Sequence, residues 1–267
     1  MTNKAVGINW TGVRDLKIVE SMISKGCVDF VEILIDNFLS CDVHTILDVL
    51  KDKPCAFHIM NSRFLDSDTK ILKSMSKSIK RLAQDLNPIY ISDHLGKFYY
   101  QGFCLPQMLE IDYASDKNKV IEKLYIWQNL LDSQVLLENY PSVFSQKIDQ
   151  ADFFSEIIDI TDCGLLFDIS NAIVAKSNTG YDVSNWLDLV CKTKNFHIAG
   201  YAPCGISHEF LVDTHDCAVT DDGLKWANYL LSKKDNMTIS VERDANFDEM
   251  EWISDVLKIR MAINDYR

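Results

Sequence analysis

The sequence predicts a closed (β/α)8 barrel that forms one domain over residues 1–267. Strand-like and helix-like segments alternate along the whole chain, which is typical of βαβ units and a parallel sheet. The strand-like segments are short and almost entirely apolar, as expected for strands that are buried on both faces. No glycine-rich dinucleotide-binding motif follows the first of them, where Trp10 leads into Thr11 and Gly12. An open doubly wound sheet is therefore disfavoured.

Eight segments are predicted to be strands, at residues 5–10, 29–35, 55–60, 89–94, 135–140, 164–169, 195–200 and 237–242. Between them, apolar residues recur at the three- and four-residue spacing of helices that pack one face against a core. The clearest helical runs cover residues 16–23, 71–86, 120–131, 226–230 and 252–263. Two connections, 96–116 and 201–220, are longer than a simple barrel needs. Both leave the end at which the strands finish, where long loops usually shape a substrate pocket.

Composition narrows the classes of function. The net charge of −12 disfavours a nucleic-acid partner and fits bound cations or a basic peptide better. The 8 cysteines stand singly, without a Cys-x-x-Cys pair, and are expected to be reduced thiols. The chain opens without a signal-peptide pattern, and no segment is apolar over the ~18 residues that a bilayer requires. We therefore expect a cytoplasmic protein that contacts no membrane.

Six of the predicted strands end at, or just before, a side chain that can bind a metal ion: His58, His94, Glu138, Asp168, His197 and Glu242. Asp213 and His215 follow in the second long loop. In a parallel barrel these strand ends form one mouth, where such folds keep their chemistry. Imidazoles and carboxylates that converge there would be costly to bury unless a cation lay between them. The pattern therefore predicts a metal cluster.

Each of these residues also has a simpler interpretation. A histidine at a strand end can be structural, and Asp168 can begin the next helix, because Asn171 follows three residues later. Three polar residues near the end of the second strand can contact substrate or cap a helix: Glu32, Asp36 and Asn37. His44 lies in a surface helix pattern, and we assign it no functional role.

The donor types limit the metal. No cysteine belongs to the set, which argues against structural zinc and iron–sulfur clusters. Mixed imidazole and carboxylate ligands suit iron, manganese, zinc or cobalt, and carboxylates can bridge neighbouring ions. The donors exceed what one ion can hold, so two or three metal ions are expected.

The ligand order His, His, Glu, Asp-x-x-Asn, His, Asp-x-His, Glu resembles that of the xylose-isomerase-like barrels with three metals. The short sequence motifs around these ligands resemble those of the multinuclear non-haem iron-dependent oxidative enzymes, and among them the iron-containing component of methanobactin biosynthesis. Ten stretches carry this resemblance: 31–38, 56–60, 91–94, 110–113, 137–142, 166–173, 178–180, 197–201, 213–216 and 242–244. One departure is Tyr201, where many members of the wider iron family have a second histidine after the glycine.

The resemblance implies three iron sites. The first would comprise His58, His94 and Glu138; the second Glu138, Asp168, His197 and Glu242; the third Asn171, Asp213 and His215. An amide oxygen is a weaker ligand than an imidazole or a carboxylate, so the Asn171 site should be the least occupied. Asp213 or His208 is expected to act as a base, and Arg243 to orient ligands or form a surface ion pair.

The resemblance also implies a reaction. Two or three irons in mixed Fe(II)/Fe(III) states, with O2 as co-substrate, would oxidise cysteines of a ribosomally made precursor peptide to oxazolone and thioamide groups. The partners would be a peptide with a basic leader and a companion protein that presents this leader, as a heterodimer. The alternatives are a trinuclear zinc phosphodiesterase of the apurinic-site endonuclease type, another peptide-modifying member of the iron family, a sugar isomerase and a non-enzymatic binding scaffold.

Overall fold

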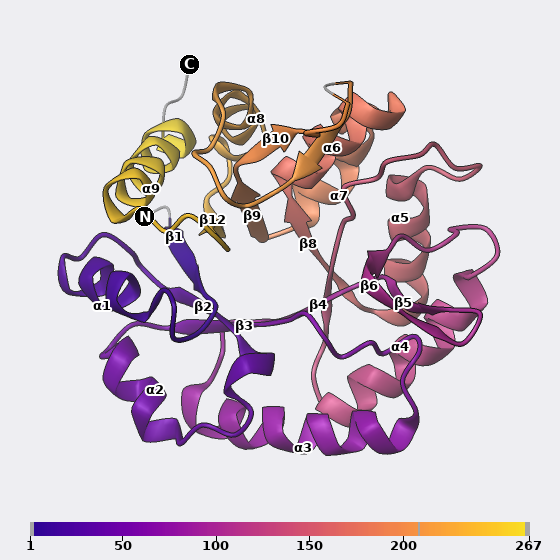
Figure 1. Cartoon of the computed structure of the whole chain (residues 1–267), viewed down its shortest axis with the longest axis horizontal. Helices are drawn as coiled ribbons and strands as arrows, with labels where there is room; N and C mark the ends of the chain where they lie inside the picture. Colours follow the sequence, from indigo (N-terminus) through magenta and orange to yellow (C-terminus); the bar gives the residue numbers. More distant parts are fainter. Residues whose placement is uncertain (1–2, 208, 265–267) are drawn as a thin grey trace.

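The computed structural model describes residues 3–207 and 209–264, and its centre is a closed barrel of parallel strands (Figure 1). The strands are β1 (Asn3–Trp10), β2 (Val31–Leu34), β3 (Cys55–Ile59), β4 (Ile91–His94), β7 (Leu136–Glu138), β8 (Gly164–Asp168), β9 (Asn195–Ala199) and β12 (Asn236–Glu242). They follow one another around the barrel in the order β1-β12-β9-β8-β7-β4-β3-β2. The predicted (β/α)8 barrel is confirmed, and each predicted strand segment overlaps one of these strands; β1 and β12 begin two residues and one residue earlier than predicted.

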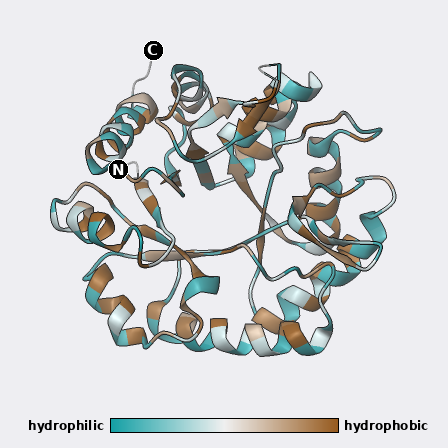
Figure 2. Ribbon diagram, viewed as in Figure 1, coloured by the Kyte–Doolittle hydropathy of each residue, from teal (hydrophilic) through white to brown (hydrophobic). Residues whose placement is uncertain are grey.

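Helices surround the barrel (Figure 1). They are α1 (Leu16–Ser24), α2 (Val43–Leu50), α3 (Thr69–Leu86), α4 (Lys117–Leu131), α5 (Gln150–Thr161), α6 (Ile169–Thr179), α7 (Leu187–Lys192), α8 (Asp221–Leu231) and α9 (Glu249–Asn264), with 3-10 turns at Ile35–Phe38 and Val183–Trp186. Hydrophobic and hydrophilic residues alternate along most of them, as expected when one face packs on a sheet (Figure 2). Residues 169–175 of α6 are all buried, so this helix lacks the polar face that marks the clearest helical runs in the sequence.

The sheet register places four of the predicted metal-binding residues directly opposite one another in two pairs. His94 lies opposite Glu138 on the neighbouring strand. Asp168 lies opposite His197 in the same way. Hydrogen bonds of the barrel therefore fix neighbouring donors side by side, before any side-chain contact is considered.

A hydrophobic layer closes the barrel beneath these donors. It contains Phe30, Ala56, Tyr90, Leu136 and Leu166, all buried and in mutual contact. Each lies two residues before a residue of the next layer up, and side chains two residues apart point to the same face of a strand. The donors thus stand on a floor that excludes water from the lower end of the barrel.

Two antiparallel hairpins rise from the mouth, where the sequence predicts long loops. One is formed by β5 (Lys97–Tyr100) and β6 (Phe103–Leu109), the other by β10 (Tyr201–Pro203) and β11 (Leu211–Asp213). Asp213, expected in a loop, is instead the last residue of a strand. The strands are short and partly exposed, so they lack the apolar run that identifies the barrel strands.

No helix within the described residues is both long enough and apolar enough to cross a membrane.

Candidate metal centre

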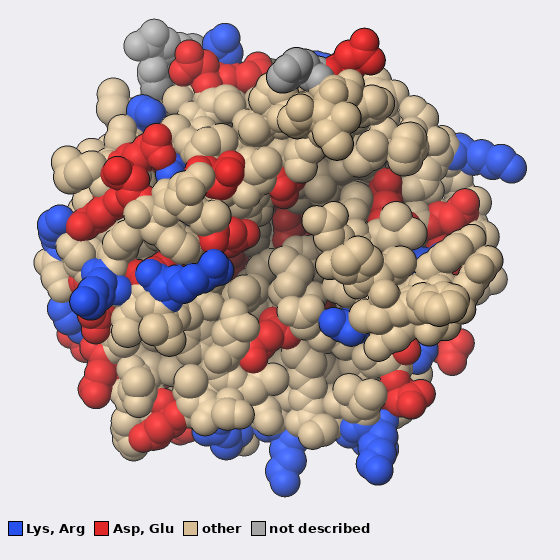
Figure 3. Space-filling view, in the orientation of Figure 1, with Lys and Arg blue, Asp and Glu red and all other residues tan. Residues whose placement is uncertain are grey.

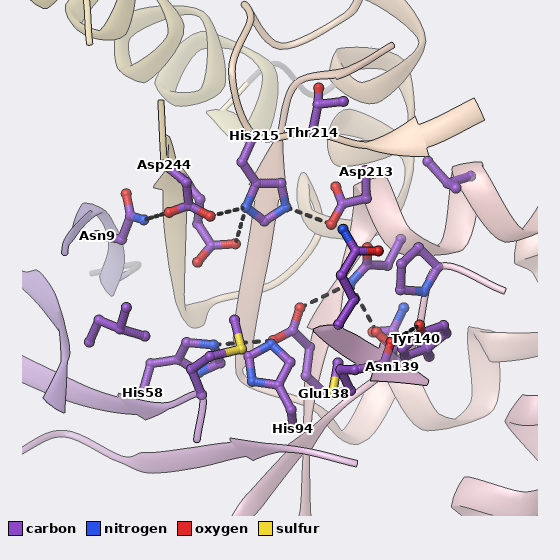
Figure 4. Close-up of a pocket in the computed structure, with 18 of the residues that line it drawn as sticks. Asn9, His58, His94, Glu138, Asn139, Tyr140, Asp213, Thr214, His215 and Asp244 are labelled. Atoms are coloured by element: carbon purple, nitrogen blue, oxygen red, sulfur yellow. Dashed lines mark hydrogen bonds and ion pairs between the residues drawn. The ribbon is translucent and has the colours of Figure 1, made fainter. Parts of the chain in front are cut away.

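The mouth of the barrel holds a cavity of about 490 Å³ that is lined by seven of the nine predicted ligands, all except Asp168 and His197. Figure 4 shows His58, His94, Glu138, Asp213 and His215 around it. Strand ends form its base, and the two hairpins and the 139–143 segment form part of its wall. In the space-filling view, a hollow near the centre of this face contains acidic side chains (Figure 3). The site is therefore a negatively charged pocket set into a rim that is mostly uncharged.

The first group of donors comprises His58, His94 and Glu138, whose ligand atoms lie within 4.8 Å of one another. The Nε2 atoms of His58 and His94 lie 3.4 and 3.3 Å from Glu138 Oε2. His94 Nδ1 donates to the Ile59 carbonyl oxygen at 3.1 Å, and His58 Nδ1 lies 2.8 Å from Ser92 Oγ. The Ser92 hydroxyl donates to another carbonyl, so it accepts from His58. Both rings therefore turn an unprotonated Nε2 towards Glu138.

The second group comprises Glu138, Asp168, His197 and Glu242, all buried, with ligand atoms again within 4.8 Å. His197 Nδ1 lies 3.1 Å from Glu242 Oε2 and 3.8 Å from Glu138 Oε2. Glu138 belongs to both groups through one carboxylate, which is the arrangement expected of a ligand that bridges two ions.

The third group comprises Asn171, Asp213 and His215. His215 Nε2 lies 2.8 Å from Asp213 Oδ2 (Figure 4). The Asn171 amide donates from Nδ2 to Glu138 Oε1 and to the Asn139 carbonyl oxygen, each at 2.9 Å. Its Oδ1 is buried without a hydrogen-bond partner. The amide is thus oriented with its oxygen available as a ligand.

Asp168 combines both of its expected roles. Its Oδ1 accepts from the Asn171 backbone N–H at 2.7 Å and caps the first turn of α6. Its Oδ2 is buried without a hydrogen-bond partner. One oxygen therefore begins the helix, and the other remains for a cation.

Unpaired buried atoms provide the test of whether these residues fit metal ions. Seven of the nine predicted ligands have a buried side-chain atom that lacks a hydrogen bond: Glu138 Oε2, Asp168 Oδ2, Asn171 Oδ1, His197 Nδ1, Asp213 Oδ1, His215 Nε2 and Glu242 Oε2. Buried polar atoms are almost always paired, and unpaired ones are costly. Five of these residues line the cavity, and Asp168 and His197 group with Glu138 and Glu242; together the seven atoms fit a set of bound cations.

The pKa values at the site reflect both burial and nearby negative charge. Burial, together with Asp213, Glu138 and Glu242, raises the pKa of Asp168 well above its ordinary value. Burial raises the pKa of Glu242 to about 6. The pKa of His197 is raised well above its usual range, because Glu242 and Glu32 outweigh the effect of burial. An electrostatic field that favours protonated groups also favours metal cations.

Several residues near the site have roles that the sequence analysis did not settle. The Asp36 carboxylate accepts from the backbone N–H groups of Met60 and Asn61, and the Asn37 amide donates to the Thr11 carbonyl, so both stabilise loops. His44 is exposed on α2, as expected. His208, one of the two expected bases, lies outside the described residues.

Of the two roles expected for Arg243, the ion pair is found, but it is buried and not at the surface. Arg243 is buried beside α9 and pairs with Asp255 at 3.0 Å and with Glu251. The physical reason is strand geometry: successive side chains alternate between faces, so the residue after Glu242 points away from the mouth. It ties β12 to α9 and does not orient a ligand.

Two acids that contact histidines of the site were not assigned to it from the sequence. Glu32 contacts His197 Nε2 at 2.8 Å, and Asp244 accepts from His215 Nδ1 at 3.1 Å. Asn9 donates to Asp244 at 2.9 Å. An acid within an apolar strand was a signal for Glu32, since such a residue is costly to bury unless it is paired.

Tyr201 takes no part in the cluster. Its hydroxyl accepts from Thr220 Oγ1 at 2.8 Å, and its backbone pairs with Asp213 between β10 and β11. It contributes to the hairpin that carries Asp213 and adds no donor at the cluster.

Known proteins resemble this chain in sequence. A family model described as "RiPP precursor modification enzyme MbnB/TglH/ChrH" matches residues 5–264. A curated "UPF0276 protein" from Caulobacter vibrioides is 31% identical over 211 residues, covering 76% of this chain and 73% of that protein.

Solved structures confirm the xylose-isomerase-like type of barrel. A xylose isomerase-like TIM barrel protein from Mycobacterium smegmatis, in complex with magnesium, matches with a TM-score of 0.63 and 14% identity, over 93% of this chain and 88% of that one. Endonuclease IV from Thermus thermophilus matches with a TM-score of 0.59 and 13% identity, over 97% and 98%. At these identities the likeness extends to the fold alone.

Proposed function

The chain belongs to the family of the RiPP precursor modification enzymes MbnB/TglH/ChrH, whose model matches residues 5–264, and from this premise we propose that it is an iron-dependent oxidase of peptide cysteines. Its substrate would be a ribosomally made precursor peptide. Within the family, the stretches that resemble the methanobactin component favour conversion of cysteine to an oxazolone with a neighbouring thioamide.

One observation supports the proposal: seven buried donor atoms without a hydrogen bond gather at the mouth of the barrel, and five of the residues that carry them line one cavity. The donors are imidazole, carboxylate and amide groups, a set that suits iron and has no thiolate. We propose His58, His94 and Glu138 for the first ion. The second ion would be held by Glu138, Asp168, His197 and Glu242, and the third by Asn171, Asp213 and His215.

When bound there, two or three irons in mixed Fe(II)/Fe(III) states would supply electron transfer to O2 and a Lewis-acid site for a cysteine thiolate. The protein's own contribution is geometry. Glu138 holds two sites at a fixed separation, and the oriented rings of His58 and His94 need no reorganisation to bind. Of the two expected bases, Asp213 belongs to the described residues and lines the cavity, so we propose it as the group that would accept a proton from the peptide.

The peptide would enter between the two hairpins. Leu95, Met108 and Val143 line this side of the cavity and would exclude water around the cysteine. The net charge of −12 favours a leader rich in lysine and arginine. We further propose that a companion protein presents this leader in a heterodimer, as the resemblance implies.

Metal analysis and product analysis together test the proposal. Protein purified without oxygen should contain two or three irons per chain and little zinc, measured by inductively coupled plasma mass spectrometry. With O2, the precursor peptide and the companion, mass spectrometry should show a loss of four hydrogens per modified cysteine. Zinc in place of iron, or an unmodified peptide with a fully iron-loaded enzyme, would overturn the assignment.

A further inference from the structure

One buried acid at the mouth belongs to none of the three proposed ligand sets. Glu32 lies on β2, two residues above Phe30 of the floor layer, and its side chain is fully enclosed. A carboxylate in such a position requires partners that compensate for its lost hydration. Its partners therefore indicate its role.

Glu32 reaches across the barrel to a histidine of the second group. Its Oε2 lies 2.9 Å from His197 Nε2 in hydrogen-bond geometry, and its Oε1 lies 2.8 Å from the same nitrogen. Strands β2 and β9 are not neighbours: β1 and β12 stand between them in the barrel. The contact is thus a cross-barrel link rather than a by-product of strand pairing.

Tyr90 fixes the other side of this carboxylate. Its hydroxyl donates to Glu32 Oε2 from the floor layer, where Tyr90 is itself buried. The carboxylate is therefore held from below by one donor and faces the His197 ring with both oxygens. Buried hydrogen bonds of this kind keep a side chain in one orientation.

The geometry points to Glu32 as the positioning residue that makes His197 a metal ligand through Nδ1, an inference that rests on the proposed metal centre. Because Glu32 accepts the proton on Nε2, the lone pair on Nδ1 faces Glu138 and Glu242. His58 and His94 are arranged in the opposite sense, with Nδ1 bonded to neutral oxygens and Nε2 towards the site.

The charge of Glu32 adds a chemical consequence. A carboxylate behind an imidazole strengthens it as a ligand and favours higher positive charge on the metal. The His58 and His94 rings, backed by a hydroxyl and a carbonyl, receive no such support. The second site should therefore bind its ion more tightly than the first.

Glu32→Gln tests this role, because the amide keeps the shape of the side chain and removes its charge. Glu110→Gln is the matched control: Glu110 also accepts from a tyrosine hydroxyl, that of Tyr113, but contacts no proposed ligand. Each protein is loaded without oxygen with Fe(II) and, separately, with Co(II), and the retained metal is measured against increasing chelator. We expect one equivalent to be held roughly 10- to 100-fold more weakly in Glu32→Gln, with Glu110→Gln like the wild type.

A spectroscopic measurement distinguishes a change at the one site that contains His197 from a general loosening of all the proposed metal sites. In ⁵⁷Fe Mössbauer spectra, Glu32→Gln should change one iron component and leave the others as in Glu110→Gln. Should Glu32→Gln fail to fold, Tyr90→Phe, which keeps the carboxylate and removes its second donor, should show a smaller change at the same component. Unchanged chelator resistance and unchanged spectra would overturn the inference.

The use of both Fe(II) and Co(II) allows the proposed iron dependence and the proposed role of Glu32 to fail independently. If the wild type holds Co(II) but not Fe(II), iron is wrong, and the Co(II) retention of Glu32→Gln still decides the role of Glu32. If the wild type holds neither metal, both proposals fail.

Discussion

The proposed ligands are mounted in two different ways. Most sit at the ends of barrel strands, where the register places His94 opposite Glu138 and Asp168 opposite His197. Asp213 and His215 are carried by a two-stranded hairpin and the turn after it. Backbone hydrogen bonds of a closed sheet fix the first kind, whereas the second kind depends on individual side-chain contacts.

The hairpin formed by β10 and β11 and the turn after it, here called the rim, show that such contacts must hold the backbone in an unfavourable conformation. His215 has a left-handed backbone with φ +48, a conformation that costs energy in a residue other than glycine unless its surroundings impose it. Its N–H donates to the Gly200 carbonyl at 3.0 Å. A Cβ at Gly200 would lie 2.0 Å from the Cys217 carbonyl oxygen, so the close approach of these segments requires glycine there. Two ligands of the proposed third site, Asp213 and His215, thus depend on local strain and contact, whereas those of the proposed first two sites depend on the sheet.

The largest effect is expected when the ligand shared between two strand-mounted groups is changed. Glu138→Gln keeps an acceptor for Asn171 but removes the charge that faces His58, His94 and His197. We expect the loss of the first and second irons and of detectable peptide oxidation, measured by metal analysis and mass spectrometry. His215→Ala should remove only the third iron. If both variants kept the same metal content, the division into strand-mounted and rim-mounted sites would be wrong.

An intermediate effect is expected from a change at Asn178, which connects α6 to β11 and to the 139–143 segment. Its amide accepts from the Leu211 N–H at 2.9 Å, donates to the Leu211 carbonyl at 3.0 Å, and also contacts the Ser142 carbonyl. Asn178→Ala should lower the free energy of unfolding by about 1–3 kcal/mol and loosen β11. Metal analysis should then show a weaker third site, with the first two retained. Equal weakening at all sites would contradict the comparison.

The smallest effect is expected in how the free energy of unfolding depends on pH through Glu110, which follows the other hairpin, β5–β6. Burial raises the pKa of Glu110 above its ordinary value of 4.5, so its protonated form is favoured in the folded protein. The stability that this group contributes is fully present below that value and is lost as the pH rises through the raised pKa. Glu110→Gln, neutral throughout, should therefore gain in stability relative to the wild type as the pH increases. Urea unfolding at several pH values checks this; a constant difference would count against it.

The sequence predicted the strand-mounted part of the site better than the rim. A short, almost entirely apolar strand that has His58 or Glu138 near its end brings that side chain to the mouth of a closed parallel barrel. For Asp213 the sequence predicted a loop, because a three-residue hairpin strand leaves no period to detect. The bond between Glu32 and His197 spans 165 residues and depends on the barrel closing, which no local pattern encodes.

The position of Arg243, in contrast, could have been predicted from the sequence. A strand that points Glu242 inward must point the next residue outward, and Arg243 meets Asp255 there. Proximity in sequence to a proposed ligand was the weaker argument.

The floor beneath the donors has a consequence for the order of events. In the part of the chain that the structure describes, Phe30, Tyr90 and Leu136 close the lower end of the barrel, so the ions, O2 and peptide of the proposed reaction would all arrive through the mouth. A peptide lying across that entrance would obstruct later arrivals. Metal loading would then have to come first, and apoenzyme already saturated with peptide should acquire iron more slowly than free apoenzyme.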